Sequence, residues 1–175
     1  ASGFAGLVWI LPVVAVVLAL VALSAAFARW RRTPDVAATG EDRALVEQAH
    51  ASFGEEARRR DIDFRLGDEP DAPTIVTDGD RVLQVITNLL ANAFRWTPDG
   101  GIVSLGTETS DGVVRIDVRD TGPGIQLDER ERIFVPFISR DNHGTGLGLP
   151  IARELSHALG GTIELESTVG AGSRF

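Results

Sequence analysis

The chain has 175 residues, with 17 basic residues that are all arginine, and it contains no cysteine, methionine or tyrosine. Without cysteine there are no disulfides, thiolate nucleophiles or cysteine-ligated metal sites. Without lysine, a P-loop, a eukaryotic-type protein kinase and Schiff-base chemistry are excluded, because each needs a lysine amine. If the protein handles a nucleotide, arginines and backbone amides must contact the phosphates.

Residues 1–28 carry no charge, and Phe4–Ala28 is a nearly continuous apolar run. Because about 20 apolar residues in a helix cross a bilayer, we expect a transmembrane helix in residues 1–28. Three arginines follow at once within Arg29–Arg32, which predicts a single-pass protein of the inner or plasma membrane with a cytoplasmic remainder. The alternative is a cleaved signal peptide, since Ala26-Phe27-Ala28 has the small-x-small form of a cleavage site.

Residues 29–40 are typical of a juxtamembrane linker, and residues 41–175 have the length of one modest domain. Three of the arginines lie within Arg29–Arg32, so Thr33–Phe175 carries 14 arginines against 25 acidic residues, a net charge near −11. DNA and RNA repel a body of this charge, and we expect no nucleic-acid partner.

Hydrophobic periodicity predicts the elements of this domain in chain order. We expect helices over Glu41–Arg60, Asp80–Trp96 (with Asp80 near its N-cap) and Leu147–Leu159, and strands over Ile62–Leu66, Thr74–Thr77, Ile102–Thr109, Val113–Asp120 and Thr162–Glu166. The 25 residues between Asp120 and Gly146 show little regular pattern. A loop of that length in so small a domain is usually functional or disordered.

The helix expected over Asp80–Trp96 carries two asparagines on one face. With residues placed every 100° around the axis, one polar stripe lies opposite an apolar one; the polar stripe consists of Arg81, Gln84, Asn88, Asn92 and Arg95. Asparagine is a poor helix former, so this stripe is either a solvated face or a set of neutral oxygen ligands. In the second interpretation the amides face Mg²⁺ bound to polyphosphate, and Arg95 faces a phosphate.

Two glycine clusters bracket the long loop. Asp120-Thr121-Gly122-Pro123-Gly124-Ile125 follows a strand and is either an ordinary Asx-type turn or a turn that approaches a flat ligand. Asp120 at the strand end can accept a hydrogen bond from an exocyclic amine, which favours adenine over guanine. Gly144-Thr145-Gly146-Leu147-Gly148-Leu149 opens the last helix, where backbone N–H groups attract an anion. A Rossmann turn would need a strand directly before Gly144, where the residues are polar.

These motifs, in this order, resemble the catalytic and ATP-binding domain of bacterial sensor histidine kinases, the Bergerat fold shared with gyrase and the Hsp90 chaperone. Asn88–Pro98 is similar to the family's N box, Asp120–Ile125 to its first glycine box, Phe134–Phe137 to its F box and Gly144–Leu149 to its second glycine box. The resemblance covers roughly Asp42–Phe175. It implies an α+β fold, a two-layer α/β sandwich with a mixed, mostly antiparallel sheet and three helices.

The resemblance also implies a role for each matching residue. Asn92 would bind Mg²⁺, Asn88 would help to hold the phosphates and Asp120 would accept from the adenine amino group. The other ATP-binding residues it implies are Arg95, Trp96, Gly122, Gly124, Ile125, Arg140, Thr145, Gly146, Leu147, Gly148 and Leu149. Asn88 stands where hydrolysing members carry a glutamate base, so ATP is expected to be held for transfer and hydrolysed slowly.

The function implied is that of a membrane-bound sensor histidine kinase of a two-component system, which transfers the γ-phosphoryl of ATP to a histidine for relay to a response regulator's receiver domain. The family carries that histidine on a dimerisation domain, in cis or in trans, and the full-length protein is expected to be a homodimer. His50 lacks the acidic neighbour and proline of the family's acceptor motif, and the family continues into a strand after Phe175. We therefore expect this chain to bind Mg·ATP without autophosphorylating.

Two other functions fit the same residues. One is an ATP-binding module that performs no phosphotransfer and regulates a partner kinase. The other is an anti-sigma-factor-like serine kinase, which shares the fold and needs no dimerisation domain; the apolar segment in residues 1–28 weighs against it.

Overall fold

The computed structural model describes residues 42–67, 77–110, 113–138 and 145–175. Contacts divide the chain into two units, and all of these residues belong to the second, Ala37–Phe175. No helix within the four ranges is long and apolar enough to span a membrane. The span and linker expected over residues 1–40 lie outside the described residues, as do Arg140, His143 and most of the strand expected over Thr74–Thr77.

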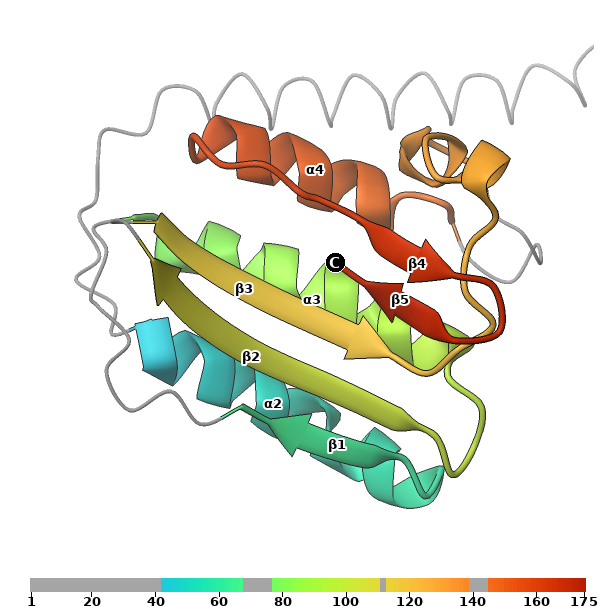
Figure 1. Ribbon diagram of the computed structural model, residues 1–175. Helices are drawn as coiled ribbons and strands as arrows, with labels where there is room; N and C mark the ends of the chain where they lie inside the picture. The colour runs from blue at the N-terminus through green and yellow to red at the C-terminus, as the bar shows by residue number, and fades with distance from the viewer. Residues whose placement is uncertain (1–41, 68–76, 111–112, 139–144) are drawn as a thin grey trace, which may run out of the picture. The chain divides into compact units, whose positions relative to one another are not determined.

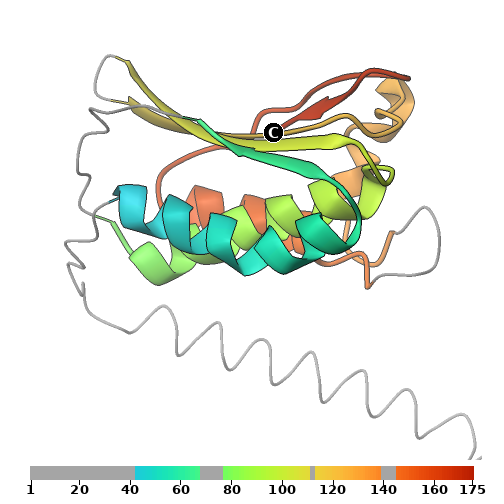
Figure 2. The same cartoon turned by 90° about the horizontal axis from the view of Figure 1, so that it is seen from below.

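The domain has two layers, a five-stranded sheet and a set of helices that covers one of its faces (Figures 1 and 2). The strands are β1 (Asp63–Leu66), β2 (Ile102–Ser110), β3 (Val113–Asp120), β4 (Glu166–Thr168) and β5 (Gly172–Arg174), in the order β1-β2-β3-β5-β4. β1 and β2 are parallel, and the other three pairs are antiparallel. The expected two-layer sandwich with a mixed, mostly antiparallel sheet is confirmed.

Three α-helices lie in the described part of the chain, α2 (Asp42–Arg59), α3 (Gly79–Trp96) and α4 (Gly148–Ala158). Two short 3-10 turns, η1 (Leu127–Glu129) and η2 (Arg132–Phe134), occupy the long loop after β3. α3 buries a stripe with the three-and-four spacing of a helix face, Ile86, Leu89, Leu90, Ala93 and Phe94. α2 and α4 pack on either side of α3 (Figure 2).

α3 begins earlier than its apolar pattern predicts. Asp78 is the N-cap, in extended backbone geometry, and its Oδ1 accepts a hydrogen bond from the Arg81 N–H at 3.2 Å. Asp80, which was expected near the N-cap, lies in the first helical turn, two residues after the cap. Asp78 and Asp80 both carry a side chain that can cap a helix, and the Arg81 N–H lies within hydrogen-bond distance of Asp78.

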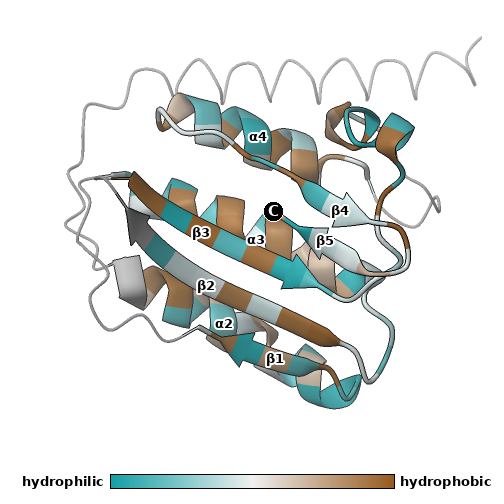
Figure 3. Cartoon of the chain, viewed as in Figure 1, coloured by the Kyte–Doolittle hydropathy of each residue, from teal (hydrophilic) through white to brown (hydrophobic). Residues whose placement is uncertain are grey.

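The core lies between the two layers. Along β2 and β3 every second residue points to the helices, so Val103, Leu105 and Val118 are fully buried while Arg115 and Arg119 face solvent. Figure 3 shows this alternation as brown and teal along the strands. The sheet therefore presents an apolar face to the helices and a charged face to water.

The strand expected over Thr162–Glu166 is wrong except for its last residue. β4 is an edge strand that pairs with β5, with Glu166 opposite Arg174 and Thr168 opposite Gly172. Because β5 offers partners over three residues, the ladder does not extend back toward Thr162. The other expected helices and strands within the described residues are confirmed, and their ends differ from the expected ones by at most one residue.

Candidate nucleotide-binding site

A pocket of about 280 Å³ opens beside α3, the loop after β3 and the start of α4. The predicted site residues that line it are Asn88, Asn92, Arg95, Trp96, Asp120, Gly124, Ile125, Thr145, Gly146, Gly148 and Leu149. Gly122 and Leu147 are not among its lining residues, and Arg140 lies outside the described part of the chain. The N box and both glycine boxes therefore meet at one pocket.

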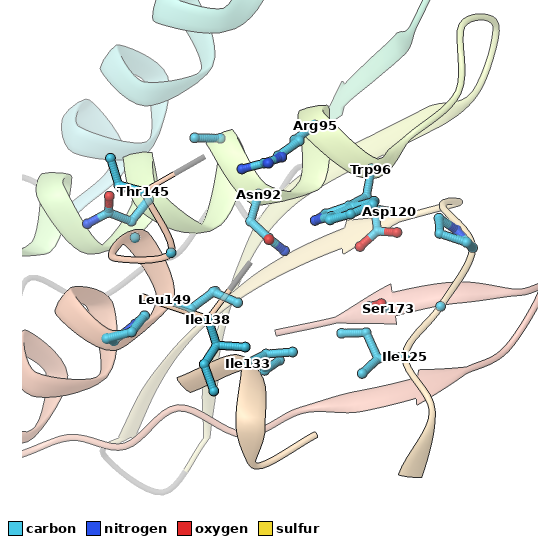
Figure 4. A pocket seen from close by; sticks show the side chains of 17 residues that line it. Asn92, Arg95, Trp96, Asp120, Ile125, Ile133, Ile138, Thr145, Leu149 and Ser173 are labelled. Atoms are coloured by element: carbon cyan, nitrogen blue, oxygen red, sulfur yellow. The ribbon is translucent and has the colours of Figure 1, made fainter. Parts of the chain in front are cut away.

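The two asparagines of α3 are half-buried in this pocket, one helical turn apart. Figure 4 shows Asn92 between Thr145 and Leu149 on one side and Asp120 on the other. A Cβ on Gly148 would lie 3.6 Å from the Asn88 Oδ1, so the first residue of α4 is close to that amide. The polar stripe of α3 thus places neutral oxygen ligands beside a helix N-terminus.

Asp120 is a buried carboxylate in the wall of the pocket, with 8% of its surface exposed. Burial raises its pKa above the ordinary 3.8, while hydrogen bonds from the backbone N–H groups of Gly122 and Ser173 oppose that shift. The Gly122 N–H donates to Oδ1 at 2.8 Å. A Cβ on Gly122 would lie 2.8 Å from both that oxygen and the Trp96 carbonyl, so this glycine shapes the pocket without lining it.

The first glycine box is fastened to the hairpin of β4 and β5. Gly124 has φ +72°, and a Cβ there would overlap the carbonyl oxygen of Thr168. The Gly170 N–H donates to the Pro123 carbonyl, and the Ile125 N–H donates to the Ser167 Oγ, both at 2.8 Å. These contacts hold β5, and with it Ser173, at the pocket.

Arg95 and Trp96 line the pocket together at the end of α3. The Arg95 guanidinium carbon lies 5.5 Å from the centroid of the Trp96 ring, a cation–π contact. Figure 4 shows the indole beside the Asp120 carboxylate. An aromatic face and a buried hydrogen-bond acceptor therefore lie next to each other, as recognition of a purine requires.

The start of α4 is built to receive an anion. Leu147 occupies the N-cap position, and its side chain makes no capping hydrogen bond, whereas Asp78 caps α3. Pro150 has no N–H, so the first-turn donors of α4 are the backbone N–H groups of Gly148 and Leu149, which line the pocket. The positive end of an 11-residue helix thus faces the pocket.

A backbone hydrogen bond joins Phe137, near the end of one described segment, to Gly146, near the start of the next. The Phe137 N–H donates to the Gly146 carbonyl at 3.1 Å. Phe137 adopts φ 64°, which is rare for a bulky residue, and its side chain is 67% exposed. Strained backbone of this kind is concentrated at functional segments.

Six lining residues were not predicted from the sequence: Ala91, Pro123, Ile133, Ile138, Pro150 and Ser173. Ile133 and Ile138 come from the loop after β3, whose sequence shows no regular pattern, so nothing in the sequence indicated that they face the pocket. Ser173 lies opposite Asp120 in the register of β3 and β5. An apolar alternation around Ser173 would have signalled a strand, but a three-residue strand is too short to show one.

The two described histidines lie outside the pocket. The His50 Nε2 is 3.3 Å from the Phe64 carbonyl, and its ring stacks on Phe64 at 4.3 Å between centroids. His157 is exposed in the last turn of α4. Among the described residues, no group of three or more histidine or acidic side chains is arranged to hold a metal ion.

Comparison with known proteins identifies the domain. The family described as "Histidine kinase-, DNA gyrase B-, and HSP90-like ATPase" matches residues 77–175, and the chain belongs to this family. The sensor histidine kinase ZraS of Escherichia coli O157:H7 is 35% identical over 131 residues, which cover 75% of this chain and 29% of ZraS. The chain thus spans less than a third of this curated relative.

Solved structures agree with this assignment. The crystal structure of full-length ShkA in complex with AMPPNP matches with a TM-score of 0.73 and 35% identity, covering 79% of this chain and 29% of ShkA. The histidine kinase ThkA in complex with the response regulator protein TrrA matches with a TM-score of 0.66 and 29% identity, covering 76% of this chain and 38% of ThkA. The described domain is therefore an ATP-binding domain of the histidine-kinase type.

Proposed function

We propose that this domain binds Mg·ATP and serves a sensor histidine kinase that transfers the γ-phosphoryl group to a histidine. The observation that carries the proposal is the pocket itself, which combines a buried carboxylate, two amide side chains and an uncapped helix N-terminus. These groups match the parts of ATP in kind: an amine donor on the base, a chelated cation and a polyphosphate anion.

The base would lie at Asp120. Its carboxylate accepts hydrogen bonds, which suits the exocyclic amine of adenine and opposes the carbonyl that guanine has in the same place. Trp96 and Ile125, on either side, offer apolar surface to the ring. The proposal therefore includes selectivity for ATP over GTP.

The phosphates would lie at the start of α4. The N–H groups of Gly148 and Leu149 and the positive helix end attract them. Mg²⁺ fits beside them because Asn88 and Asn92 offer neutral oxygens, and the metal's remaining ligands would come from phosphate and water. Bound there, Mg²⁺ would neutralise charge on the phosphates, while Asn88, unlike a carboxylate, cannot act as a base on water.

The phosphoacceptor would be a histidine on a dimerisation domain, presented in cis or in trans. His50 is a poor candidate because its ring is stacked on Phe64 and its Nε2 contacts a carbonyl. The likeness to ThkA, which was crystallised with a response regulator protein, supports a receiver domain as the next acceptor. We further propose a homodimer, since a shared dimerisation domain would join two chains.

We also propose that one helix anchors the protein in the membrane, with the ATP-binding domain in the cytoplasm. The support is the uncharged run within residues 1–28 and the arginines that follow it. Retention of the chain in the membrane pellet after alkaline carbonate extraction is expected. Release into the supernatant would contradict the anchor and leave the ATP site untouched.

Calorimetry with the purified chain tests the nucleotide site. Asp120→Asn presents an amide N–H₂ to the base and should weaken ATP binding by at least about tenfold. For Asn92→Ala, the ATP affinity measured with Mg²⁺ should be little higher than the affinity measured with EDTA. Gln84→Ala, an exposed change on the same face of α3 outside the pocket, is the control. Unchanged ATP affinity in both site variants would overturn the assignment.

Radiolabelled ATP separates nucleotide binding from phosphotransfer. The chain alone is expected to bind γ-labelled ATP and to acquire no acid-labile label. The same chain mixed with a phosphoacceptor dimerisation domain of a sensor kinase should transfer label to that domain's histidine. Label on His50 of the chain alone would contradict the proposal that the acceptor lies elsewhere.

A further inference from the structure

Arg60 connects the end of α2 to the C-terminal end of α3, the helix that carries the N box. Its Nη1 donates to the Phe94 carbonyl at 2.5 Å and its Nη2 to the Thr97 carbonyl at 2.7 Å. Its Nε donates to the Asp99 carboxylate at 2.8 Å, and the side chain is only 22% exposed. Three nitrogen atoms of one guanidinium therefore donate hydrogen bonds to the segment from Phe94 to Asp99.

The contacts of Arg60 complete the C-terminus of α3. The last carbonyls of a helix lack intrahelical partners, and a cation there interacts favourably with the helix dipole. The Ala93 carbonyl accepts from both the N–H and the Oγ1 of Thr97, at 3.0 and 2.7 Å. Arg60 supplies the donor for the next carbonyl, Phe94, and for Thr97 itself.

The same helix end faces the pocket on its other side. Trp96 lies between the residues whose carbonyls Arg60 holds, and its own carbonyl lies so close to Gly122 that a Cβ there would come within 2.8 Å. The loop between α3 and β2 also contacts the backbone of Arg60, because the Gly100 N–H donates to the Arg60 carbonyl at 3.1 Å. The last turn of α3 is therefore held between Arg60 and the first glycine box.

We propose that Arg60 is a positioning residue for the nucleotide site, which sets the direction of Trp96 by holding the last turn of α3. It does not line the pocket, so it would act through the helix end rather than by touching the nucleotide. This inference rests on the proposed ATP function.

The test measures Mg·ATP affinity and Trp96 fluorescence in the full chain, with Trp9→Phe and Trp30→Phe so that one indole reports. Arg60→Gln should raise the Kd for Mg·ATP about tenfold and increase quenching of Trp96 by acrylamide at a temperature where the chain is fully folded. Arg59→Gln is the matched control, because Arg59 is the adjacent arginine, is 71% exposed and pairs with Glu56 of its own helix.

Two further variants separate positioning from simple stability. Asp99→Asn removes the ion pair and leaves both carbonyl contacts, so affinity should stay within about twofold of the parent. Arg60→Lys, which offers one ammonium in place of three directed donors, should give an intermediate Kd. If Arg60→Gln lowers the melting temperature but leaves the Kd and the quenching of the folded chain unchanged, the inference is wrong. Failure of the parent to bind ATP would instead overturn the proposed function.

Discussion

The Asp120 carboxylate accepts a hydrogen bond from the Gly122 N–H at 2.8 Å while it is 92% buried in the pocket wall. The two residues are joined by a turn that needs glycine, because a side chain on Gly122 would press against that same carboxylate. Burial of a carboxylate costs folding free energy, and a ligand that donates a further hydrogen bond to it offsets part of that cost.

Asp120→Asn is expected to raise the stability of the unliganded domain. Burial raises the Asp120 pKa above 3.8, so ionisation costs folding free energy that an amide does not require. The sign follows from proton linkage: the native state binds the proton more tightly, so wild-type stability falls as pH rises through the raised pKa. Urea unfolding of both proteins should show the variant's advantage growing above pH 3.8 and then staying constant.

An advantage that is independent of pH across this range would show that burial does not govern the ionisation of Asp120. Asp128→Asn is a suitable control, since Asp128 is exposed in η1. Removing that charge should change the unfolding free energy by less than about 0.5 kcal/mol.

Asp117→Asn is expected to have the opposite effect. The Arg174 guanidinium donates to both carboxylate oxygens of Asp117, at 2.7 and 2.9 Å, and holds its pKa below the usual value. Loss of this bidentate pair between β3 and β5 should cost about 2 kcal/mol at neutral pH. Because the stabilisation belongs to the ionised carboxylate, the difference between the two proteins should shrink as pH falls below 3.8.

The surface pair of Glu108 and Arg115 is the matched control for that ion pair. Its single contact measures 3.5 Å, and both side chains are about half exposed. Glu108→Gln should cost less than about 0.5 kcal/mol by the same urea titration. Equal losses in the two variants would mean that bidentate geometry and burial contribute nothing to the Asp117 pair.

The sequence predicted the helices and the long strands because their patterns extend over many residues. α3 repeats its apolar stripe through five buried positions, and β2 and β3 alternate over eight or nine residues. β4 and β5 have three residues each, which is too few to show an alternation of apolar and polar residues, so only their pairing in the sheet defines them. The misplaced strand at Thr162–Glu166 has this cause.

The residues of the candidate site also fall into two groups, those that a sequence motif identifies and those that only the fold brings to the pocket. Glycine and asparagine motifs identify residues with unusual local demands, which a sequence displays directly, and so Asn92, Asp120 and Gly148 could be found without coordinates. Ile133 and Ser173 line the same pocket, but they belong to no motif, and only their position in the fold brings them there. Arg60 is hidden for the same reason, since its partners at the end of α3 lie far along the chain.

Gly124→Ala is expected to destabilise the domain by at least about 2 kcal/mol, because alanine is strained at positive φ and its methyl group would also meet the Thr168 carbonyl. Gly100→Ala is the control: Gly100 has φ +77° but open space around its Cβ position, so only the backbone strain of about 1 kcal/mol applies. Both values come from urea unfolding. Equal losses would mean that the first glycine box can move away from the β4–β5 turn.

Asp61→Gly is expected to stabilise the domain. α2 ends in a Schellman arrangement in which the Ile62 N–H donates to the Ala57 carbonyl at 2.9 Å and Asp61 adopts φ 54°. A left-handed residue other than glycine costs about 1 kcal/mol, so glycine should raise the unfolding free energy by roughly that amount. Asp61→Ala removes the same charge while keeping a Cβ, and it should bring no such gain. If the alanine variant is stabilised equally, the carboxylate rather than the backbone is responsible, and the left-handed end of α2 carries no measurable strain.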